Sequence, residues 1–258
     1  MILINAFLLF TNPVLGVLII SLLYSVYSKR PLGNLMFNCI FINGAINSIL
    51  KSTFKVPLHI SLNNTCWWSF PSGHMQYGIV LWGMLWVNSN FNLKLLWFFI
   101  GLLILSAFAI NYNHYHTYFE MLGAVPPAAA IISIYYVMYK KNLSLINLNI
   151  ISIILQAVVI LNIESPCIGY KLNWMYLNLG ANIGLLITLF FHKHETETYQ
   201  LQTTIKNIKF NILKLLLMLT SICIFWYIIT VFRTIDGNFI CGIFLPLVLF
   251  FISKLRNP

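Results

Sequence analysis

The sequence is poor in charged side chains, and acidic ones are the scarcest. Only 8% of its 258 residues are charged, with five Asp and Glu against fifteen Lys and Arg, whereas soluble domains carry about 25%. A water-soluble core cannot enclose the apolar surface of a chain that is 60% hydrophobic. The apolar residues come in stretches of about 20, long enough for a helix to cross a bilayer. The composition therefore predicts a membrane protein and excludes a soluble domain.

Other scarcities exclude further classes of protein. The five cysteines have no spacing such as C-x₂-C, so no metal site is predicted. The fifteen basic residues are dispersed among short polar segments and form no stripe, which excludes a nucleic-acid-binding surface. Residues 1–10 are apolar and have neither a basic start nor a small-residue cleavage site. They are therefore expected to remain as a helix and not to act as a signal peptide.

Apolar runs separated by Lys, Asn and Pro predict an all-α, polytopic membrane helix bundle of about nine transmembrane helices. The expected helices are residues 3–27, 34–55, 72–89, 94–111, 117–139, 144–163, 172–191, 210–232 and 239–253. The last one is the least regular because it contains Pro246. The first six expected helices lie in residues 1–163, and residues 164–258 hold the last three as a C-terminal membrane extension.

Lys and Arg are distributed unevenly between the two faces of this nine-helix arrangement. One face receives Lys29, Arg30, Lys94, Lys140, Lys141, Lys193, Lys206, Lys209, Lys214, Lys254 and Arg256. The other face receives only Lys51, Lys55, Lys171 and Arg233. Because cytoplasmic loops carry the excess of Lys and Arg, the second face is predicted to be extracytoplasmic. The chain would then be a multi-pass protein of the cell or inner membrane.

Two cysteines, Cys66 and Cys167, fall in loops of this extracytoplasmic face. An oxidising compartment permits a disulfide between them, and free thiols are the alternative. Cys39 and Cys223 lie within expected helices, where a buried thiol packs like a small apolar side chain.

The residues best suited to chemistry lie in three segments that also fall on the weakly charged face. The segments are the end of the second expected helix with Lys51 and Lys55, the sequence Phe70-Pro71-Ser72-Gly73-His74, and the connection that holds His114, His116 and Glu120. Because the chain alternates between the two faces, all three segments are expected on one side of the membrane. Lysines, histidines and one carboxylate would then form a single cluster.

The spacing of the histidines predicts which of them can act as a nucleophile. His116 and Glu120 are four residues apart, so they share one face of a helix. Glu120 can accept the proton of one His116 ring nitrogen and leave the other nitrogen free to attack phosphorus. His114 lacks such a partner because Tyr118 lies four residues after it.

The start of the third expected helix is suited to binding an anion. Ser72 and Gly73 would expose unpaired backbone N–H groups there. His74, when protonated, can donate a proton to a leaving oxygen. Lys51 and Lys55 would neutralise phosphate charge, and the alternative is that they are ordinary lysines reaching from a helix end to the membrane surface.

Motifs in the same segments resemble a known family. The segment Ser69-Phe70-Pro71-Ser72-Gly73-His74 resembles the second signature of the type 2 phosphatidic acid phosphatase superfamily, which also contains the vanadium haloperoxidases. His116, Glu120 and the following Gly123-Ala124 are similar to the end of the third signature of that family. Lys51 is similar to the start of the first signature.

The chain departs from these signatures at their arginines. The positions where the resemblance places them hold Leu58 and Ile110, and the usual aspartate is Glu120. Arginine binds phosphate through a planar fork, whereas lysine is a point charge. Loss of one such transition-state donor commonly lowers the rate by about 10²–10³-fold.

The resemblance implies a six-helix phosphatase core and a lipid-phosphate phosphatase that acts through a phosphohistidine on His116 and needs no metal or cofactor. Its substrates would be amphiphilic, such as phosphatidic acid, a phosphatidylglycerol phosphate or a polyprenyl diphosphate. Transfer of the phosphoryl group to a second lipid or sugar is an alternative. The missing arginines favour a third interpretation, in which the chain is a non-catalytic lipid-binding or transporting relative. The retained His74, His116 and Glu120 favour an enzyme instead. No oligomeric state is indicated.

Overall fold

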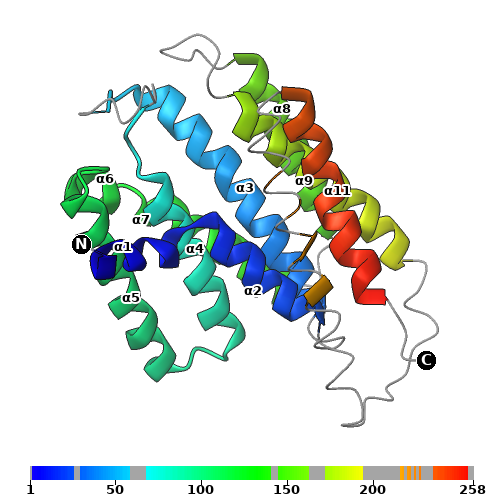
Figure 1. The fold of residues 1–258 in the computed structure, drawn as a ribbon, viewed down its shortest axis with the longest axis horizontal. Helices are drawn as coiled ribbons and strands as arrows, with labels where there is room; N and C mark the ends of the chain where they lie inside the picture. Colours follow the sequence, from blue (N-terminus) through cyan, green and yellow to red (C-terminus); the bar gives the residue numbers. More distant parts are fainter. Residues whose placement is uncertain are drawn as a thin grey trace. The chain divides into compact units, whose positions relative to one another are not determined.

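The computed structural model describes residues 2–25, 30–58, 68–140, 145–162, 172–193 and 235–254, with isolated positions between 216 and 227. Within these ranges every regular element is a helix, and extended pairing is limited to one bridge between Pro57 and Trp68. The helices are α1 (Ile2–Phe7), the 3₁₀ helix η1 (Leu8–Thr11), α2 (Pro13–Ser25), α3 (Arg30–Phe54), α4 (Gly73–Asn88), α5 (Leu93–Tyr112), α6 (Tyr118–Leu122), α7 (Val125–Lys140), α8 (Leu145–Asn162), α9 (Leu172–Lys193) and α11 (Ile235–Lys254) (Figure 1). The all-α prediction is confirmed for this part of the chain.

Two helical stretches among the described residues are long and apolar enough to cross a membrane. They are Leu93–Tyr112, which is α5, and Tyr118–Val137, which covers α6 and most of α7. Large apolar side chains of α5 are exposed, among them Trp97 and Phe98. These stretches are compatible with a membrane protein, whereas the count of nine spans stays a prediction.

The first expected helix, residues 3–27, is wrong as one continuous element. It is interrupted after η1, and α2 begins at Pro13. Proline disfavours helical conformation in the residue before it, and Asn12 is accordingly extended, with φ of −86° and ψ of 132°. Proline is well tolerated at the first position of the helix that follows, because the N–H group it lacks would have no partner there.

The fifth expected helix, residues 117–139, is also divided, into α6 and α7. Pro126 and Pro127 follow the division and occupy the first turn of α7. They carry no N–H groups to continue the hydrogen bonds of α6, so the helical ladder restarts at Val125. The eighth expected helix, residues 210–232, lies mostly outside the described residues.

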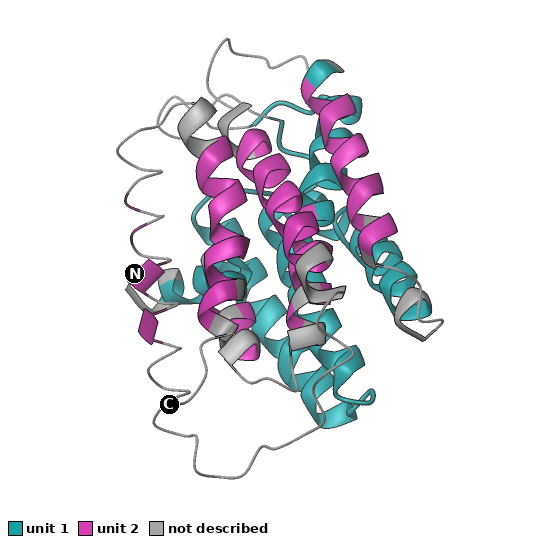
Figure 2. Cartoon of the chain, turned by 90° about the vertical axis from the view of Figure 1, so that its right-hand side faces the viewer, with its two compact units in different colours: residues 1–17, 42–143, 161–171 teal, residues 18–41, 144–160, 172–258 magenta. Residues whose placement is uncertain are grey.

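Contacts divide the chain into two compact units (Figure 2). Unit 1 consists of residues 1–17, 42–143 and 161–171, and unit 2 of residues 18–41, 144–160 and 172–258. The first part of α3 therefore belongs to unit 2, and its last part, which carries Lys51, belongs to unit 1. The predicted division at residue 163 marks the end of the expected phosphatase-like core. It is a different criterion from these contact-based units, and it stays a prediction.

In unit 1, side chains of α4 donate hydrogen bonds to carbonyl oxygens of the interrupted N-terminal segment. Trp82 Nε1 donates to the Phe10 carbonyl oxygen at 2.9 Å, and the Tyr77 hydroxyl donates to the Pro13 carbonyl oxygen at 3.1 Å. Buried main-chain carbonyl groups need such partners, above all where water is excluded. The N-terminal segment thereby holds α4, whose first turn belongs to the candidate site.

In unit 2, α9 and α11 lie side by side with their backbones in contact at glycines (Figure 1). A Cβ atom on Gly180 would overlap the Phe239 carbonyl oxygen, and one on Gly184 would overlap the Ile243 carbonyl oxygen. The two glycines are four residues apart, the spacing that allows close approach of membrane helices.

We expect Gly180→Val to destabilise the protein by about 1–3 kcal/mol, because valine at this position overlaps a backbone carbonyl group that cannot move away alone. The measurement is the midpoint of thermal unfolding in detergent. Gly101→Val is the matched control, since a Cβ atom on Gly101 in α5 meets no atom within 4 Å. Equal midpoints for the two variants would contradict the close packing of α9 and α11.

Candidate active site

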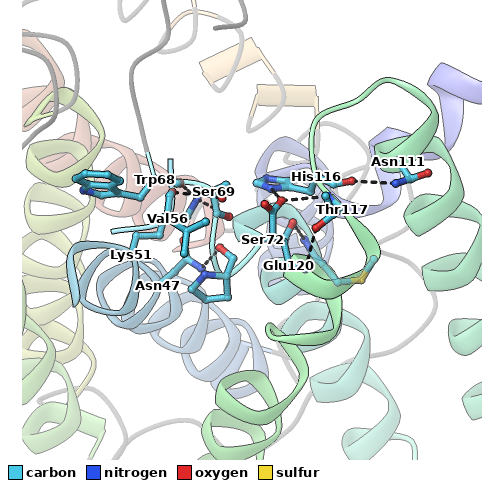
Figure 3. A network of polar contacts seen from close by, with 12 residues as sticks. Asn47, Lys51, Val56, Trp68, Ser69, Ser72, Asn111, His116, Thr117 and Glu120 are labelled. Atoms are coloured by element: carbon cyan, nitrogen blue, oxygen red, sulfur yellow. Dashed lines mark hydrogen bonds and ion pairs between the residues drawn. The ribbon is translucent and has the colours of Figure 1, made fainter. Parts of the chain in front are cut away.

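The three chemistry-bearing segments meet within unit 1 (Figure 3). Lys51 in the last turn of α3 donates from Nζ to the Trp68 carbonyl oxygen at 2.6 Å. The amide of Ser72, just before α4, donates to the Glu120 carbonyl oxygen at 3.0 Å. The end of α3, the start of α4 and α6 are therefore joined by direct hydrogen bonds.

His116 and Glu120 form a buried pair of ionisable side chains in the cluster. His116 Nδ1 lies 2.9 Å from Glu120 Oε2, and the two side chains are only 8% and 6% exposed. Glu120 also forms a capping box with Thr117, whose amide donates to Glu120 Oε2 at 3.0 Å. Because the carboxylate accepts the proton on Nδ1, His116 Nε2 keeps an unprotonated lone pair.

The surroundings keep the His116 ring neutral at physiological pH. Burial, followed by the positive charge of Lys51, lowers the pKa of His116 from 6.5 to about 4, against the opposing hydrogen bond to Glu120. A neutral ring is the form that can act as a nucleophile. The pair is therefore prepared for attack without a separate deprotonation step.

We expect the acidic limb of the pH profile of kcat/KM to fall near pH 4 and not near pH 6.5. The lone pair of His116 is lost only when the ring is protonated, and the lowered pKa delays this step. Stability should fall as the pH drops from about 6.5 to about 4, because over this interval the unfolded chain binds a proton at His116 that the folded protein does not bind. The measurement uses a substrate whose phosphate does not titrate in this range, and a limb centred near pH 6.5 would contradict the geometry.

Lys51 is buried, and its ammonium group is fixed beside the signature segment. Besides Trp68, the Ser69 carbonyl oxygen lies 3.5 Å from Nζ. An ammonium group has three donors, so Lys51 retains capacity for an anionic ligand. Lys55 lies just after the end of α3 with φ of 49° and an exposed side chain, so the structure leaves this second predicted phosphate ligand at the surface.

The prediction that Ser72 offers an unpaired amide is wrong, because that amide donates to Glu120. Ser72 instead caps α4: its buried hydroxyl oxygen accepts from the Met75 amide at 3.4 Å. The amides of Gly73 and His74 have no partner among the described residues, and they begin a helix of 16 residues. The anion-binding amides of this helix start are therefore those of Gly73 and His74.

A chain of buried amide side chains supports this helix start. Asn47 Nδ2 donates to the Pro71 carbonyl oxygen at 3.3 Å and to Gln76 Oε1 at 2.8 Å. Gln76 Nε2 in turn donates to Asn43 Oδ1 at 2.8 Å. A Cβ atom on Gly73 would lie 3.1 Å from Asn47 Oδ1, so glycine permits this close approach. Sequence reasoning missed these amides, although Asn43, Asn47 and Lys51 recur every four residues along one face of α3.

No protein-family model, curated protein or solved structure matches this chain. The resemblance of its motifs to the phosphatase signatures therefore has no support beyond the motif residues themselves.

The other predicted histidines differ in position. His74 is the second residue of α4, is exposed, and is close enough to His116 to affect it electrostatically. His114 is exposed in the turn after α5 with φ of 56°, and its side chain has no partner among the described residues. The structure thus brings His74 to the cluster and leaves His114 beside it.

Two further predictions concern cysteines and metal. Cys66 and Cys167 lie outside the described residues, so their disulfide stays a prediction, as does the packing of Cys223. Cys39 is a free, fully buried thiol, as expected for a packing residue. Within the described part of the chain, no group of three His, Cys, Asp or Glu residues is arranged to hold a metal ion.

Proposed function

We propose that the chain is a membrane enzyme that hydrolyses or transfers the phosphoryl group of a lipid phosphate, with His116 as the nucleophile. The observation that carries the proposal is the 2.9 Å contact between His116 Nδ1 and Glu120 Oε2. It lies beside a helix start whose first amides have no partner among the described residues. A neutral imidazole oriented by a carboxylate, next to an anion-binding helix start, is suited to attack on a phosphate ester.

The proposed reaction runs in two steps. Lys51 and the amides of Gly73 and His74 hold the phosphate oxygens while His116 Nε2 forms a bond to phosphorus. The ester P–O bond breaks, and a protonated His74 gives its proton to the departing oxygen. Water, or the hydroxyl of an acceptor, then attacks the phosphohistidine, returns a proton to His74 and frees His116.

Aromatic side chains next to the site support an amphiphilic substrate. The Phe70 ring packs against Phe54 at a centroid distance of 5.0 Å and against Phe119 at 5.6 Å. Phe54 and Phe119 are more than half exposed, so they offer an apolar surface beside Ser72 and Glu120. A lipid chain can lie there while its phosphate reaches the amides of α4.

The test is product formation by the purified protein from a panel of lipid phosphates: phosphatidic acid, a phosphatidylglycerol phosphate and a polyprenyl diphosphate. We expect turnover without added metal, and a labelled phosphoryl group trapped on the peptide that contains His116. A hydroxyl-bearing lipid added in excess distinguishes a transferase, since the label then appears on that lipid instead of in free phosphate.

A non-catalytic lipid-binding relative is the second candidate, because no arginine lies between residues 31 and 232. It predicts saturable binding of lipid phosphates with neither turnover nor a phosphohistidine. That combination, obtained with protein that elutes as a single species in detergent, would replace the enzyme proposal.

We further expect the site to face away from the cytoplasm, since the segments that form it carry few of the Lys and Arg residues. Single cysteines at Asn64 and at Lys140, each in a cysteine-free background, test this. A membrane-impermeant thiol reagent applied to intact cells should label position 64 and not position 140. The reverse pattern would contradict the orientation.

A further inference from the structure

The charges of the candidate site nearly cancel. Its charges are at most the cation of Lys51 and the anion of Glu120, which is the one acidic residue among the first 163. Burial and Lys51 keep His116 neutral. With His74 neutral the cluster has no net charge, and with His74 protonated it has a single positive charge.

The positive charge that a bound phosphate meets is therefore at most one net charge, from Lys51 and a protonated His74 against Glu120. Lys55 is exposed, so solvent and salt screen its charge. The carboxylate of Glu120 lies against the nucleophile and repels any anion that His116 approaches. Each negative charge on the substrate beyond the first would enter a buried site without a partner, which is costly.

Phosphate esters differ in charge. A phosphomonoester carries about two negative charges at neutral pH, because its second pKa is about 6. A phosphodiester has no second proton to lose and carries a single negative charge at the same pH. A site with at most one net positive charge, together with the uncharged amides of Gly73 and His74, matches the diester and leaves the monoester with excess negative charge.

We infer that the substrate is a singly charged lipid phosphodiester. This inference rests on the proposed function and narrows its substrate class. His116 Nε2 forms the bond to phosphorus, one of the two ester P–O bonds breaks, and the departing alcohol takes the proton of His74. The phosphohistidine keeps the other ester group. Attack by water then yields a phosphomonoester, attack by an alcohol yields a new phosphodiester, and the proton of the attacking group returns to His74.

The first test compares phosphatidylglycerol with phosphatidic acid of the same acyl chains, in mixed micelles with the wild-type protein. We expect kcat/KM to favour the diester by at least about tenfold near pH 8, which corresponds to about 1.4 kcal/mol. The preference should shrink as the pH falls through about 6, where the monoester becomes singly charged. A preference for phosphatidic acid at the higher pH, or a preference that does not change with pH, overturns the inference.

The second test measures binding alone, so it does not depend on how well each ester leaves. The probes are a long-chain α,α-difluoroalkylphosphonate, whose second pKa is close to the value of about 6 of a phosphate ester so that it is doubly charged near pH 8, and its monomethyl ester, which is singly charged. We expect the monomethyl ester to bind at least about tenfold more tightly, the same energy difference as above. Equal or tighter binding of the doubly charged probe overturns the inference, whereas absence of turnover of every phosphate ester rejects the proposed function instead.

Discussion

Replacement of His116 by alanine is expected to reduce turnover by about 10³-fold or more, because the variant has no atom that can form the covalent intermediate. The ring nitrogen that would attack phosphorus is the one left free by the contact between His116 Nδ1 and Glu120. Substrate binding should change less than turnover, since Lys51 and the amides of α4 remain. The measurement is product release under single-turnover conditions, with folding checked by chromatography in detergent.

The matched control for this prediction is His114→Ala. His114 lies two residues earlier, is exposed, and its side chain has no partner among the described residues. Its removal should change turnover by less than about twofold, as for a surface substitution away from the reacting groups. Activity that survives His116→Ala and disappears in His114→Ala would mean that the other histidine is the nucleophile.

Helix boundaries could be predicted where a polar residue marks them. The expected helix 94–111 is observed as Leu93–Tyr112, and Asn92 caps it by accepting from the amides of Lys94 and Leu95. The N-terminal break was not predicted because apolar residues continue on both sides of Thr11, Asn12 and Pro13, so hydropathy alone favours one helix over residues 3–27. A proline after an extended asparagine begins a helix and does not continue one.

The site could be predicted only as far as its interactions are local in sequence. The pair of His116 and Glu120 follows from helix periodicity, and Thr117 with Glu120 matches the capping-box spacing. The bond from the Ser72 amide to the Glu120 carbonyl oxygen joins two segments distant in sequence. No local sequence pattern predicts such a contact. The Ser72 amide was therefore expected to be unpaired, although in the fold it donates to Glu120.

The contacts of Asn47 could not be predicted for the same reason, because they join segments that are distant in sequence. Its side chain joins α3 to the start of α4 through Pro71 and Gln76, and no signature marks it. A buried amide in an apolar helix is costly unless it is paired, so its presence alone was a signal. A polar amide in an apolar helix indicates that a hydrogen-bond partner exists, but it does not identify that partner.

Glu120→Gln is expected to slow turnover by about 10²–10⁴-fold, the range seen when an orienting carboxylate or a transition-state donor is lost. Glu120 Oε2 accepts from His116 Nδ1 at 2.9 Å and from the Thr117 amide at 3.0 Å. Glutamine has one acceptor oxygen, and its NH₂ group, if turned toward the ring, would require Nδ1 to be the acceptor. The proton would then sit on Nε2, the atom that has to attack.

The fold should survive this substitution, because the bond from the Ser72 amide to position 120 uses the main-chain carbonyl oxygen, which Glu120→Gln leaves in place. Glu120→Asp is the control, since it keeps the negative charge and both acceptor oxygens at a shorter reach, so its loss of turnover should be smaller. Single-turnover rates for the two variants, measured beside their unfolding midpoints, separate orientation of His116 from stability. If Glu120→Gln retained more activity than Glu120→Asp, the charge and the tautomer of the pair would not matter, and Glu120 would act only by capping α6.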